Sequence, residues 1–250
     1  MSRPFNSISK NELIDAAAAS RAGRALRPLT MVIKRNAFRT LAFENTRILT
    51  LAFAYLRSEG VPGDYAEFGV STGRTFVEAW RIANDHDGSD RRFFAFDSFE
   101  GLPATEGVDA TGRFAAGEFS QDRASLEARM RRARIPDDRA HIVEGFFEDT
   151  LARPERIPLE EVALAWVDCD LYSSTVPVLD YLTPRLAQGA ILLFDDWFCF
   201  KGDPTKGEAR ACEEWLERNP EISLVPWRQH HWASQAFIFR RAGESATIGG

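Results

Sequence analysis

From about Gly63 onward, short β-rich runs alternate with helical patterns, and this alternation limits the possible folds more than any other feature of the chain. It is typical of βαβ units built around a mainly parallel sheet. The pattern predicts seven strands, at residues 64–70, 92–97, 140–145, 162–168, 190–195, 222–227 and 232–240. The helices predicted between them cover residues 72–84, 121–134, 175–186 and 207–218, and we expect Gly189 to mark the end of the third. The predicted fold class is therefore α/β.

Three further segments frame this sheet. Only residues 228–231 separate the last two predicted strands, which is too short for a parallel crossover, so we expect a terminal antiparallel hairpin. Residues 1–62 form an N-terminal helical extension, with helical patterns at 11–27 and 37–58, that either caps the sheet or mediates a homo-oligomer. Residues 63–250 form the single main domain. Within it, residues 101–120 contain four glycines and indicate a long loop of the kind that acts as a lid over a site.

Composition excludes several classes of protein. The net charge of −6 disfavours a nucleic-acid-binding protein, because such proteins neutralise phosphates with Lys and Arg. The longest early run without a charge, Leu49–Leu56, is far short of the roughly 20 apolar residues of a membrane span, so we expect no membrane partner. We expect a cytoplasmic protein, because no export signal is visible and three cysteines without ligand spacing fit reduced thiols.

The first predicted strand carries a ligand-binding pattern at its end. Gly69 and Gly73 open a turn into the next helix, where a nucleoside-bearing ligand can approach the backbone closely. The next strand ends in Asp97, and an acid at this place in a doubly wound sheet accepts hydrogen bonds from ribose hydroxyls. Glu67 would then hold a ligand amine. The turn lacks the full Gly-x-Gly-x-x-Gly of dinucleotide sites, and an ordinary strand-to-helix turn with a helix N-cap explains these residues equally well.

Four carboxylates follow two apolar runs late in the chain: Asp168 and Asp170, then Asp195 and Asp196. The ends of adjacent parallel strands meet at one edge of an open sheet, so these acids would converge there and need a counter-charge. Mg²⁺ fits, since it prefers carboxylate oxygens, and the pattern offers no His or Cys of the kind that zinc prefers. The alternative is that some of these acids only cap the helices that follow, with Asp170 and Asp195 as the candidates.

Five segments of the chain resemble the macrocin O-methyltransferase family, which includes Mg²⁺-dependent methyltransferases that act on sugars of macrolide and aminocoumarin antibiotics. The segments are Ala66–Gly73, Phe96–Pro103, Val143–Leu151, Val167–Thr175 and Phe194–Trp197. The strings Asp-Ser-Phe-Glu-Gly-Leu-Pro and Asp-x-Asp-x-Tyr-x-Ser-Thr are the specific ones. The resemblance implies a Rossmann-like class I methyltransferase fold that binds S-adenosylmethionine (SAM) and has a seven-stranded, mostly parallel sheet.

The same resemblance implies roles for individual residues. Asp168, Asp195 and Asp196 would hold Mg²⁺, and Asp170 would be the catalytic base. Within the matched segments we assign SAM binding to Glu67, Gly69, Val70, Ser71, Gly73, Asp97, Ser98, Gly145, Phe146, Asp149 and Asp168. Around the acids we assign a wall for the methyl acceptor to Tyr172, Trp197 and Phe198.

Four further polar side chains are kept out of the predicted mechanism. Arg74 and Arg113 are candidate contacts for an acidic acceptor, but such residues are more often solvated charges. His230 and His231 fall in the terminal hairpin, which we expect to lie away from the strand ends that carry the acids.

Taken together, these residues predict an enzyme that methylates a hydroxyl of a sugar or related diol, a natural product or glycan, with SAM and Mg²⁺. Two other enzyme classes share the Asp-x-Asp pair. In haloacid dehalogenase-like phosphatases Asp168 would be the nucleophile, but that motif normally follows the first strand and here it follows the fourth. In nucleotide-sugar glycosyltransferases the pair would bind Mn²⁺ and a diphosphate, which leaves Glu67 and Asp97 without a role.

Overall fold

The computed structural model describes residues 21–87 and 90–243. The chain divides into two units, Met1–Phe43 and Glu44–Gly250, and the second unit contains the whole sheet. Helix α2 (Arg21–Ser58) begins in the first unit and ends in the second. None of the helices described is long and apolar enough to cross a membrane.

The N-terminal extension differs from the prediction. The predicted break between residues 27 and 37 is wrong, because α2 continues through it. A single proline, Pro28, removes only one backbone hydrogen bond, and here it does not end the helix. The first part of the other predicted helix, residues 11–20, lies outside the described residues. The domain boundary at residues 62 and 63 and the homo-oligomer stay predictions.

Seven strands form one sheet in the order β3-β2-β1-β4-β5-β7-β6. Their bounds are β1 (Asp64–Phe68), β2 (Phe93–Asp97), β3 (Ala140–Glu144), β4 (Val162–Val167), β5 (Leu186–Phe194), β6 (Ile222–Arg228) and β7 (Gln235–Arg241). The first five strands run parallel, whereas β7 pairs antiparallel with both β5 and β6. The predicted seven-stranded, mostly parallel sheet with an antiparallel hairpin is confirmed.

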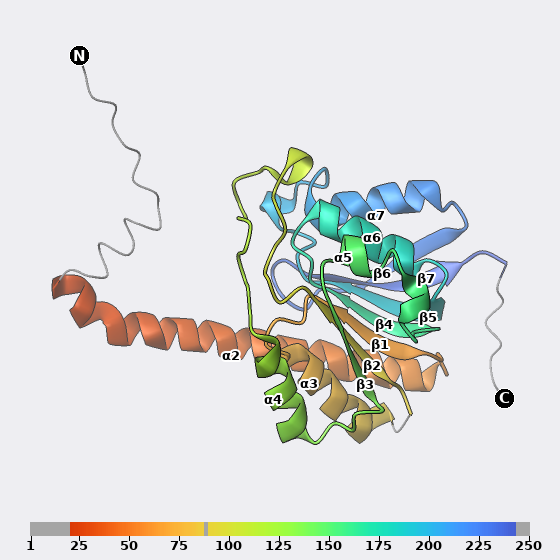
Figure 1. Ribbon diagram of the computed structural model, residues 1–250, viewed down its shortest axis with the longest axis horizontal. Helices are drawn as coiled ribbons and strands as arrows, with labels where there is room; N and C mark the ends of the chain where they lie inside the picture. The colour runs from red at the N-terminus through yellow and green to blue at the C-terminus, as the bar shows by residue number, and fades with distance from the viewer. Residues whose placement is uncertain (1–20, 88–89, 244–250) are drawn as a thin grey trace, which may run out of the picture. The chain divides into compact units, whose positions relative to one another are not determined.

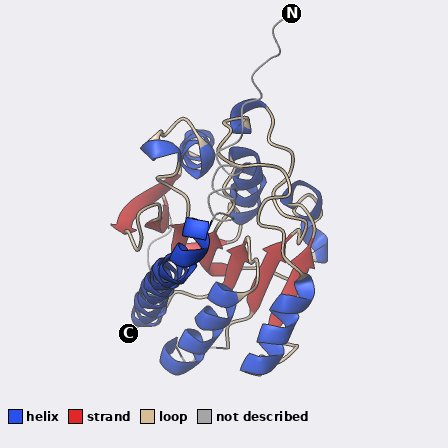
Figure 2. Cartoon of the chain, turned by 90° about the vertical axis from the view of Figure 1, so that its left-hand side faces the viewer, coloured by secondary structure: helices blue, strands red, loops and turns tan. Residues whose placement is uncertain are grey.

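Helices cover both faces of this sheet (Figures 1 and 2). One face carries α3 (Arg74–Ile82), α4 (Arg123–Ala133) and the part of α2 from residue 44 onward. The other face carries α5 (Phe147–Thr150), α6 (Tyr172–Leu182) and α7 (Gly207–Arg218). A π-helical turn, η1 (Ala83–Asp87), extends α3, and short 3₁₀ turns form at η2 (Gly107–Asp109), η3 (Pro154–Arg156) and η4 (Phe200–Gly202).

The predicted end of the third helix, now α6, is wrong. This helix ends at Leu182, and Gly189 lies inside β5 with a φ of +85°. A tight turn, in which the Arg185 N–H donates to the Leu182 carbonyl, separates the helix from the strand. Thr183, Pro184 and Arg185 interrupt the apolar pattern at this border, and a proline just after a helix typically marks its end, so this signal outweighs Gly189.

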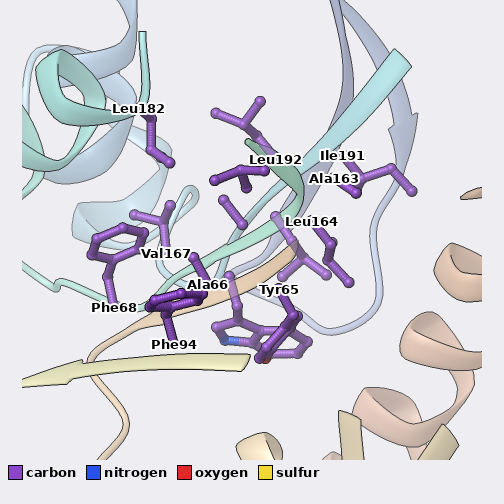
Figure 3. Close-up of a cluster of buried hydrophobic side chains, with 14 of the residues drawn as sticks. Tyr65, Ala66, Phe68, Phe94, Ala163, Leu164, Val167, Leu182, Ile191 and Leu192 are labelled. Atoms are coloured by element: carbon purple, nitrogen blue, oxygen red, sulfur yellow. The ribbon is translucent and has the colours of Figure 1, made fainter. Parts of the chain in front are cut away.

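The core lies where the central strands meet these helices. Every residue of β1 and β4 is buried, as expected for parallel strands covered on both faces. Figure 3 shows side chains of β1, β2, β4, β5 and α6 packed together, among them Phe68, Phe94, Val167, Leu192 and Leu182. The rings of Phe68 and Phe96 stack at 4.5 Å between centroids, which joins β1 to β2. This packing fixes the strand ends that carry the polar residues.

Candidate active site

The strand register brings the predicted ligand-binding residues to one edge of the sheet. Phe68 pairs with Phe96 and with Val167, and Val167 pairs with Phe194. The residues that follow these strands therefore emerge side by side. Strands β2 and β3 are added on one side of β1, whereas β4 and β5 are added on its other side. The strand order therefore reverses between β1 and β4, and open α/β sheets bind ligands at such a switch point.

A cavity of about 590 Å³ opens at this edge, a size that suits a small-molecule ligand. Its walls come from the turns after the five parallel strands and from loop 101–120. It is lined by ten of the predicted site residues: Gly69, Ser71, Asp97, Ser98, Gly145, Phe146, Asp168, Asp170, Asp195 and Asp196. The structure thus brings the predicted metal and base residues and seven of the eleven residues assigned to SAM together in one cavity.

The part of the cavity formed by Gly69, Ser71, Asp97, Ser98, Gly145 and Phe146 is called the cofactor half below. Its central carboxylate is held by the backbone. Asp97 Oδ2 accepts a hydrogen bond from the Ser71 N–H, and Asp97 Oδ1 accepts one from the Phe99 N–H, both at 2.7 Å. Each carboxylate oxygen keeps a further lone pair, so Asp97 can still accept hydrogen bonds from ligand hydroxyls.

Gly69 and Gly73 in the first turn are each required to be glycine, but by different neighbours. Gly69 has a φ of +90°, and a Cβ there would lie 1.9 Å from the Asp168 carbonyl oxygen, so only glycine lets this turn approach the end of β4. Gly73 has a φ of +74°, and a Cβ there would lie 2.2 Å from Leu126 Cδ1. Gly73 therefore serves the packing of α3 on α4 and does not line the cavity.

Three more of the residues assigned to SAM stand behind or beside the cavity lining: Glu67, Val70 and Asp149. Glu67 is 1% exposed and accepts a hydrogen bond from the Tyr65 hydroxyl at 2.5 Å. Burial raises the pKa of the Glu67 carboxyl to about 8. Its role as the partner of a ligand amine stays a prediction.

The opposite part of the cavity, called the acid half below, consists of Asp168, Asp170, Asp195 and Asp196. One carboxylate oxygen from each of Asp168, Asp195 and Asp196 lies within 4.8 Å of the other two. Burial, reinforced by Asp195, raises the pKa of Asp168 well above its usual range. Burial, reinforced by Asp196, raises the pKa of Asp170 to about 9. These acids crowd one another, and a cation among them would offset the repulsion.

A fifth acid, Glu208 in the first turn of α7, supports the acid half from behind and was missed in the sequence. It is fully buried, and its oxygens accept hydrogen bonds from the N–H groups of Cys169 at 3.1 Å and Asp196 at 2.9 Å. One carboxylate thus ties together the turns after β4 and β5. Nothing in the sequence pattern of α7 distinguishes Glu208 from the exposed acids of the same helix.

The expectation that His230 and His231 lie away from the acids is wrong. His231 Nε2 lies 3.1 Å from Asp195 Oδ1, and His230 Nε2 lies 3.5 Å from the same oxygen. The reason is topological: Gln235 at the start of β7 pairs with Phe194 at the end of β5, so the hairpin turn returns to the acids. Although burial alone would raise it, contact with the two imidazoles lowers the pKa of Asp195.

Loop 101–120 is attached to the site at several points. The Leu102 carbonyl and N–H pair with the backbone of Gly117 and Glu118 at the base of the loop. Asp109, only 2% exposed, accepts hydrogen bonds from the N–H groups of Tyr172 at 2.9 Å and Ser173 at 3.0 Å. Asp109 therefore caps the N-terminus of α6, which has no side-chain cap of its own. Movement of this loop as a lid stays a prediction.

Arg113 in this loop reaches the acid half through Cys199. Its guanidinium lies 3.2 Å from Cys199 Sγ, which in turn lies 2.8 Å from Asp196 Oδ1. Burial and the neighbouring Asp196 carboxylate raise the pKa of the Cys199 thiol, which keeps it protonated and able to donate.

The predicted acceptor wall does not line the cavity. The Tyr172 hydroxyl donates to Glu214 on α7 at 2.6 Å, and Trp197 packs on Phe237 with ring centroids 4.8 Å apart. Phe198 is 37% exposed. The assignment of Tyr172, Trp197 and Phe198 to the acceptor stays a prediction. Arg74, which was kept out of the predicted mechanism, is exposed on α3.

Known proteins resemble this chain in sequence. One relative is 8-demethyl-8-(2,3-dimethoxy-α-L-rhamnosyl)-tetracenomycin-C 4′-O-methyltransferase of Streptomyces olivaceus. The two sequences are 32% identical over 146 residues, and this alignment covers 56% of this chain and 55% of the relative. Another relative is mycinamicin III 3″-O-methyltransferase of Micromonospora griseorubida, 31% identical over 147 residues. This alignment covers 56% of this chain and 57% of the relative. The matches thus span little more than half the length of these relatives.

Solved structures resemble it in fold. The O-methyltransferase NovP superposes with a TM-score of 0.65 at 22% identity over 79% of this chain and 80% of its own. The calicheamicin methyltransferase CalS11 superposes with a TM-score of 0.62 at 25% identity over 96% of each chain. The sequence pattern of the family described as macrocin-O-methyltransferase (TylF) matches residues 10–214, most of the chain. The protein therefore belongs to the macrocin O-methyltransferase family.

Proposed function

We propose that this protein is a SAM-dependent and Mg²⁺-dependent O-methyltransferase that acts on a hydroxyl of a sugar or related diol. The observation that carries the proposal is a single cavity with a nucleoside-type half-site at one end and three converging carboxylates at the other. Membership of the family supports methyl transfer. The relatives named as 4′-O- and 3″-O-methyltransferases support a sugar hydroxyl as the acceptor.

The cofactor half is assigned to SAM. The turn at Gly69 and Ser71 permits close approach of a ligand to the backbone, and Asp97 has free lone pairs for ribose hydroxyls. When bound, SAM supplies a methyl group on a sulfonium that is already a good leaving group. The chain therefore needs only to bind, orient and exclude water on this side.

The acid half is assigned to Mg²⁺, and the residues present fit this ion. Asp168, Asp195 and Asp196 offer three hard oxygen ligands within 4.8 Å of one another. Mg²⁺ also leaves coordination positions open to small molecules. When bound, it would lower the pKa of an acceptor hydroxyl and offset the negative charge of the acids.

Asp170 is assigned as the base. It lines the same cavity but stands outside the group of three carboxylates whose oxygens converge. In this position it would take the proton of the acceptor hydroxyl while the other acids are occupied with the cation. The phosphatase and glycosyltransferase alternatives give no comparable role to Asp97 and the glycine turn.

The test is methyl transfer from radiolabelled SAM to a panel of 6-deoxyhexosides with vicinal hydroxyls, in the presence of Mg²⁺. UDP-glucose and p-nitrophenyl phosphate serve as substrates for the two alternative classes. We expect label in a deoxyhexoside and a methyl ether localised by NMR to one of its hydroxyls. Failure of SAM to bind in calorimetry, or release of phosphate or glucose from the other two substrates, would overturn the proposal.

A further inference from the structure

The turn between β6 and β7, residues 229–234, lies against the acid half and is held in one conformation. The Ser234 hydroxyl oxygen accepts hydrogen bonds from the N–H groups of His230 at 3.1 Å and His231 at 3.0 Å. Ser234 itself is fully buried. On the other side, the Phe198 N–H donates to the Ala233 carbonyl at 2.6 Å, which joins this turn to the loop after β5. The histidine side chains are therefore presented from a fixed backbone.

Hydrogen bonding within this turn decides which nitrogen of His231 carries the proton. The Ala233 N–H donates to His231 Nδ1 at 3.2 Å, so Nδ1 must keep its lone pair. A neutral imidazole with an unprotonated Nδ1 carries its proton on Nε2. That nitrogen lies 3.1 Å from Asp195 Oδ1. His231 is therefore a hydrogen-bond donor to Asp195.

The same proton prevents His231 from acting as a metal ligand through Nε2, because a protonated ring nitrogen has no lone pair to share. Its neighbour His230 packs edge-on, with ring centroids 4.4 Å from His231 and 5.2 Å from Trp166. His230 Nε2 lies farther from Asp195 Oδ1 than His231 Nε2 does, at 3.5 Å, and His230 Nδ1 has no hydrogen-bond partner among the described residues. His230 thus forms a wall that restrains the plane of the His231 ring.

We propose that His231 is a positioning residue: by donating from Nε2 to Asp195 Oδ1, it fixes the orientation of this carboxylate for a divalent cation. The inference rests on the proposed function, because it assumes that Asp195 is a metal ligand. Partners of this kind orient metal ligands in many proteins, and their loss typically lowers metal affinity by roughly 10- to 100-fold. No motif of the family resemblance includes His231, which comes from the last hairpin.

The experiment compares His231→Leu with His231→Gln in the full chain. Leucine removes the donor, whereas the glutamine amide can still donate a hydrogen bond over a similar reach. His141→Gln, on β3 and stacked on Phe94, is the matched control for a histidine replacement outside the site. Mn²⁺ is the probe, with its affinity and stoichiometry measured by electron paramagnetic resonance. The tautomer of His231 is read from the ring ¹⁵N shifts of the metal-free wild-type protein.

We expect an Nε2–H tautomer for His231 and one Mn²⁺ per chain in the wild type. His231→Leu should weaken Mn²⁺ binding by roughly 10- to 100-fold, while His231→Gln and His141→Gln stay within about threefold of the wild type. An Nδ1–H tautomer, or equal affinities in His231→Leu and the wild type, would overturn the proposal. So would two Mn²⁺ per chain with one lost in His231→Leu, because His231 would then be a ligand itself. A wild-type protein that binds no Mn²⁺ would instead refute the metal site of the proposed function.

Discussion

The two halves of the cavity differ in how closely their carboxylates approach other negative charges. In the cofactor half, the chain itself provides the partners: both oxygens of Asp97 accept backbone N–H groups at 2.7 Å. In the acid half, carboxylates face one another, with oxygens of Asp168, Asp195 and Asp196 within 4.8 Å. Burial and mutual repulsion raise the pKa of both Asp168 and Asp196. The carboxylate of the first half has its partners before a ligand arrives, whereas the proposed function requires a cation to complete the second half.

Because of this difference, substitutions in the two halves should affect stability and ligand binding differently. Loss of the Asp168 or Asp196 carboxylate should remove a repulsion, and so should not destabilise the metal-free fold by that electrostatic effect. Loss of Asp97 should leave the N–H groups of Ser71 and Phe99 without this acceptor, so the turn loses two hydrogen bonds that hold it. Ligand binding should separate in the same way, with the cation lost in one case and SAM weakened in the other.

The largest effect is expected for Asp196→Asn. Mg²⁺ held by a few carboxylates tolerates little loss of charge, so cation binding and turnover should both disappear. The affinity for SAM should stay near that of the wild type, because the cofactor half is untouched. Calorimetric titrations with Mg²⁺ and SAM check this prediction. A variant that bound Mg²⁺ like the wild type would exclude Asp196 as a metal ligand. A variant that also lost SAM binding would show that the halves are not separate.

Asp170→Asn should leave both binding steps intact and slow the chemistry. Asparagine keeps the shape of the side chain but removes the proton acceptor, and general bases typically contribute roughly 10²- to 10⁴-fold to a rate. The turnover rate should fall within that range while the dissociation constants of Mg²⁺ and SAM change little. Wild-type turnover in this variant would exclude Asp170 as the base. Loss of Mg²⁺ binding would make it a ligand instead.

Asp97→Ala should make the free energy of SAM binding less favourable by about 1.5 to 3 kcal/mol, which is the usual contribution of charge-assisted hydrogen bonds. The dissociation constant for SAM would then rise by roughly 10- to 150-fold, with Mg²⁺ binding unchanged. Asp97→Asn is the control, because it keeps one acceptor oxygen for the turn. An unchanged SAM affinity in Asp97→Ala would remove this residue from the cofactor half.

The smallest effect concerns pH and Glu67, a carboxyl behind the cofactor half. Burial raises its pKa from the ordinary 4.5 to about 8, so the folded protein holds a proton that the unfolded chain releases. This contribution to stability is fully present below about pH 4.5 and is lost as the pH rises through 8. Urea unfolding of SAM-free protein at pH 5, 6.5 and 8 should therefore show a steeper fall for the wild type than for Glu67→Gln. The exposed Glu160→Gln is the control and should keep the wild-type slope.

Much of the fold follows from the sequence because the parallel strands are buried on both faces and therefore form continuous apolar runs. The boundary of α6 did not follow, because its N-terminal cap is Asp109 from a distant loop and no local cap marks its start. The prediction that Gly189 marks the end of α6 was also wrong. Glycine with positive φ ends many helices, but here it lies within β5.

Some residues of the site could likewise be predicted from the sequence, and others could not. The acids at the ends of β4 and β5 were recognised because two carboxylate pairs after apolar runs form a local pattern. His231 was missed because the sequence specifies a hairpin but not its direction, and a hairpin with β6 antiparallel beside β5 would have placed the turn at the opposite edge. Glu208 was missed because its function depends on burial against Cys169 and Asp196, which helical periodicity does not reveal.

The central claim is that a cation completes the acid half and that methyl transfer depends on it. The most direct measurement is the initial rate of methyl transfer from SAM to an accepted deoxyhexoside, in EDTA and after Mg²⁺ is added back in excess. The account predicts a rate near background in EDTA and full recovery with Mg²⁺, while the dissociation constant of SAM is the same in both conditions. Full methyl transfer in EDTA would contradict it.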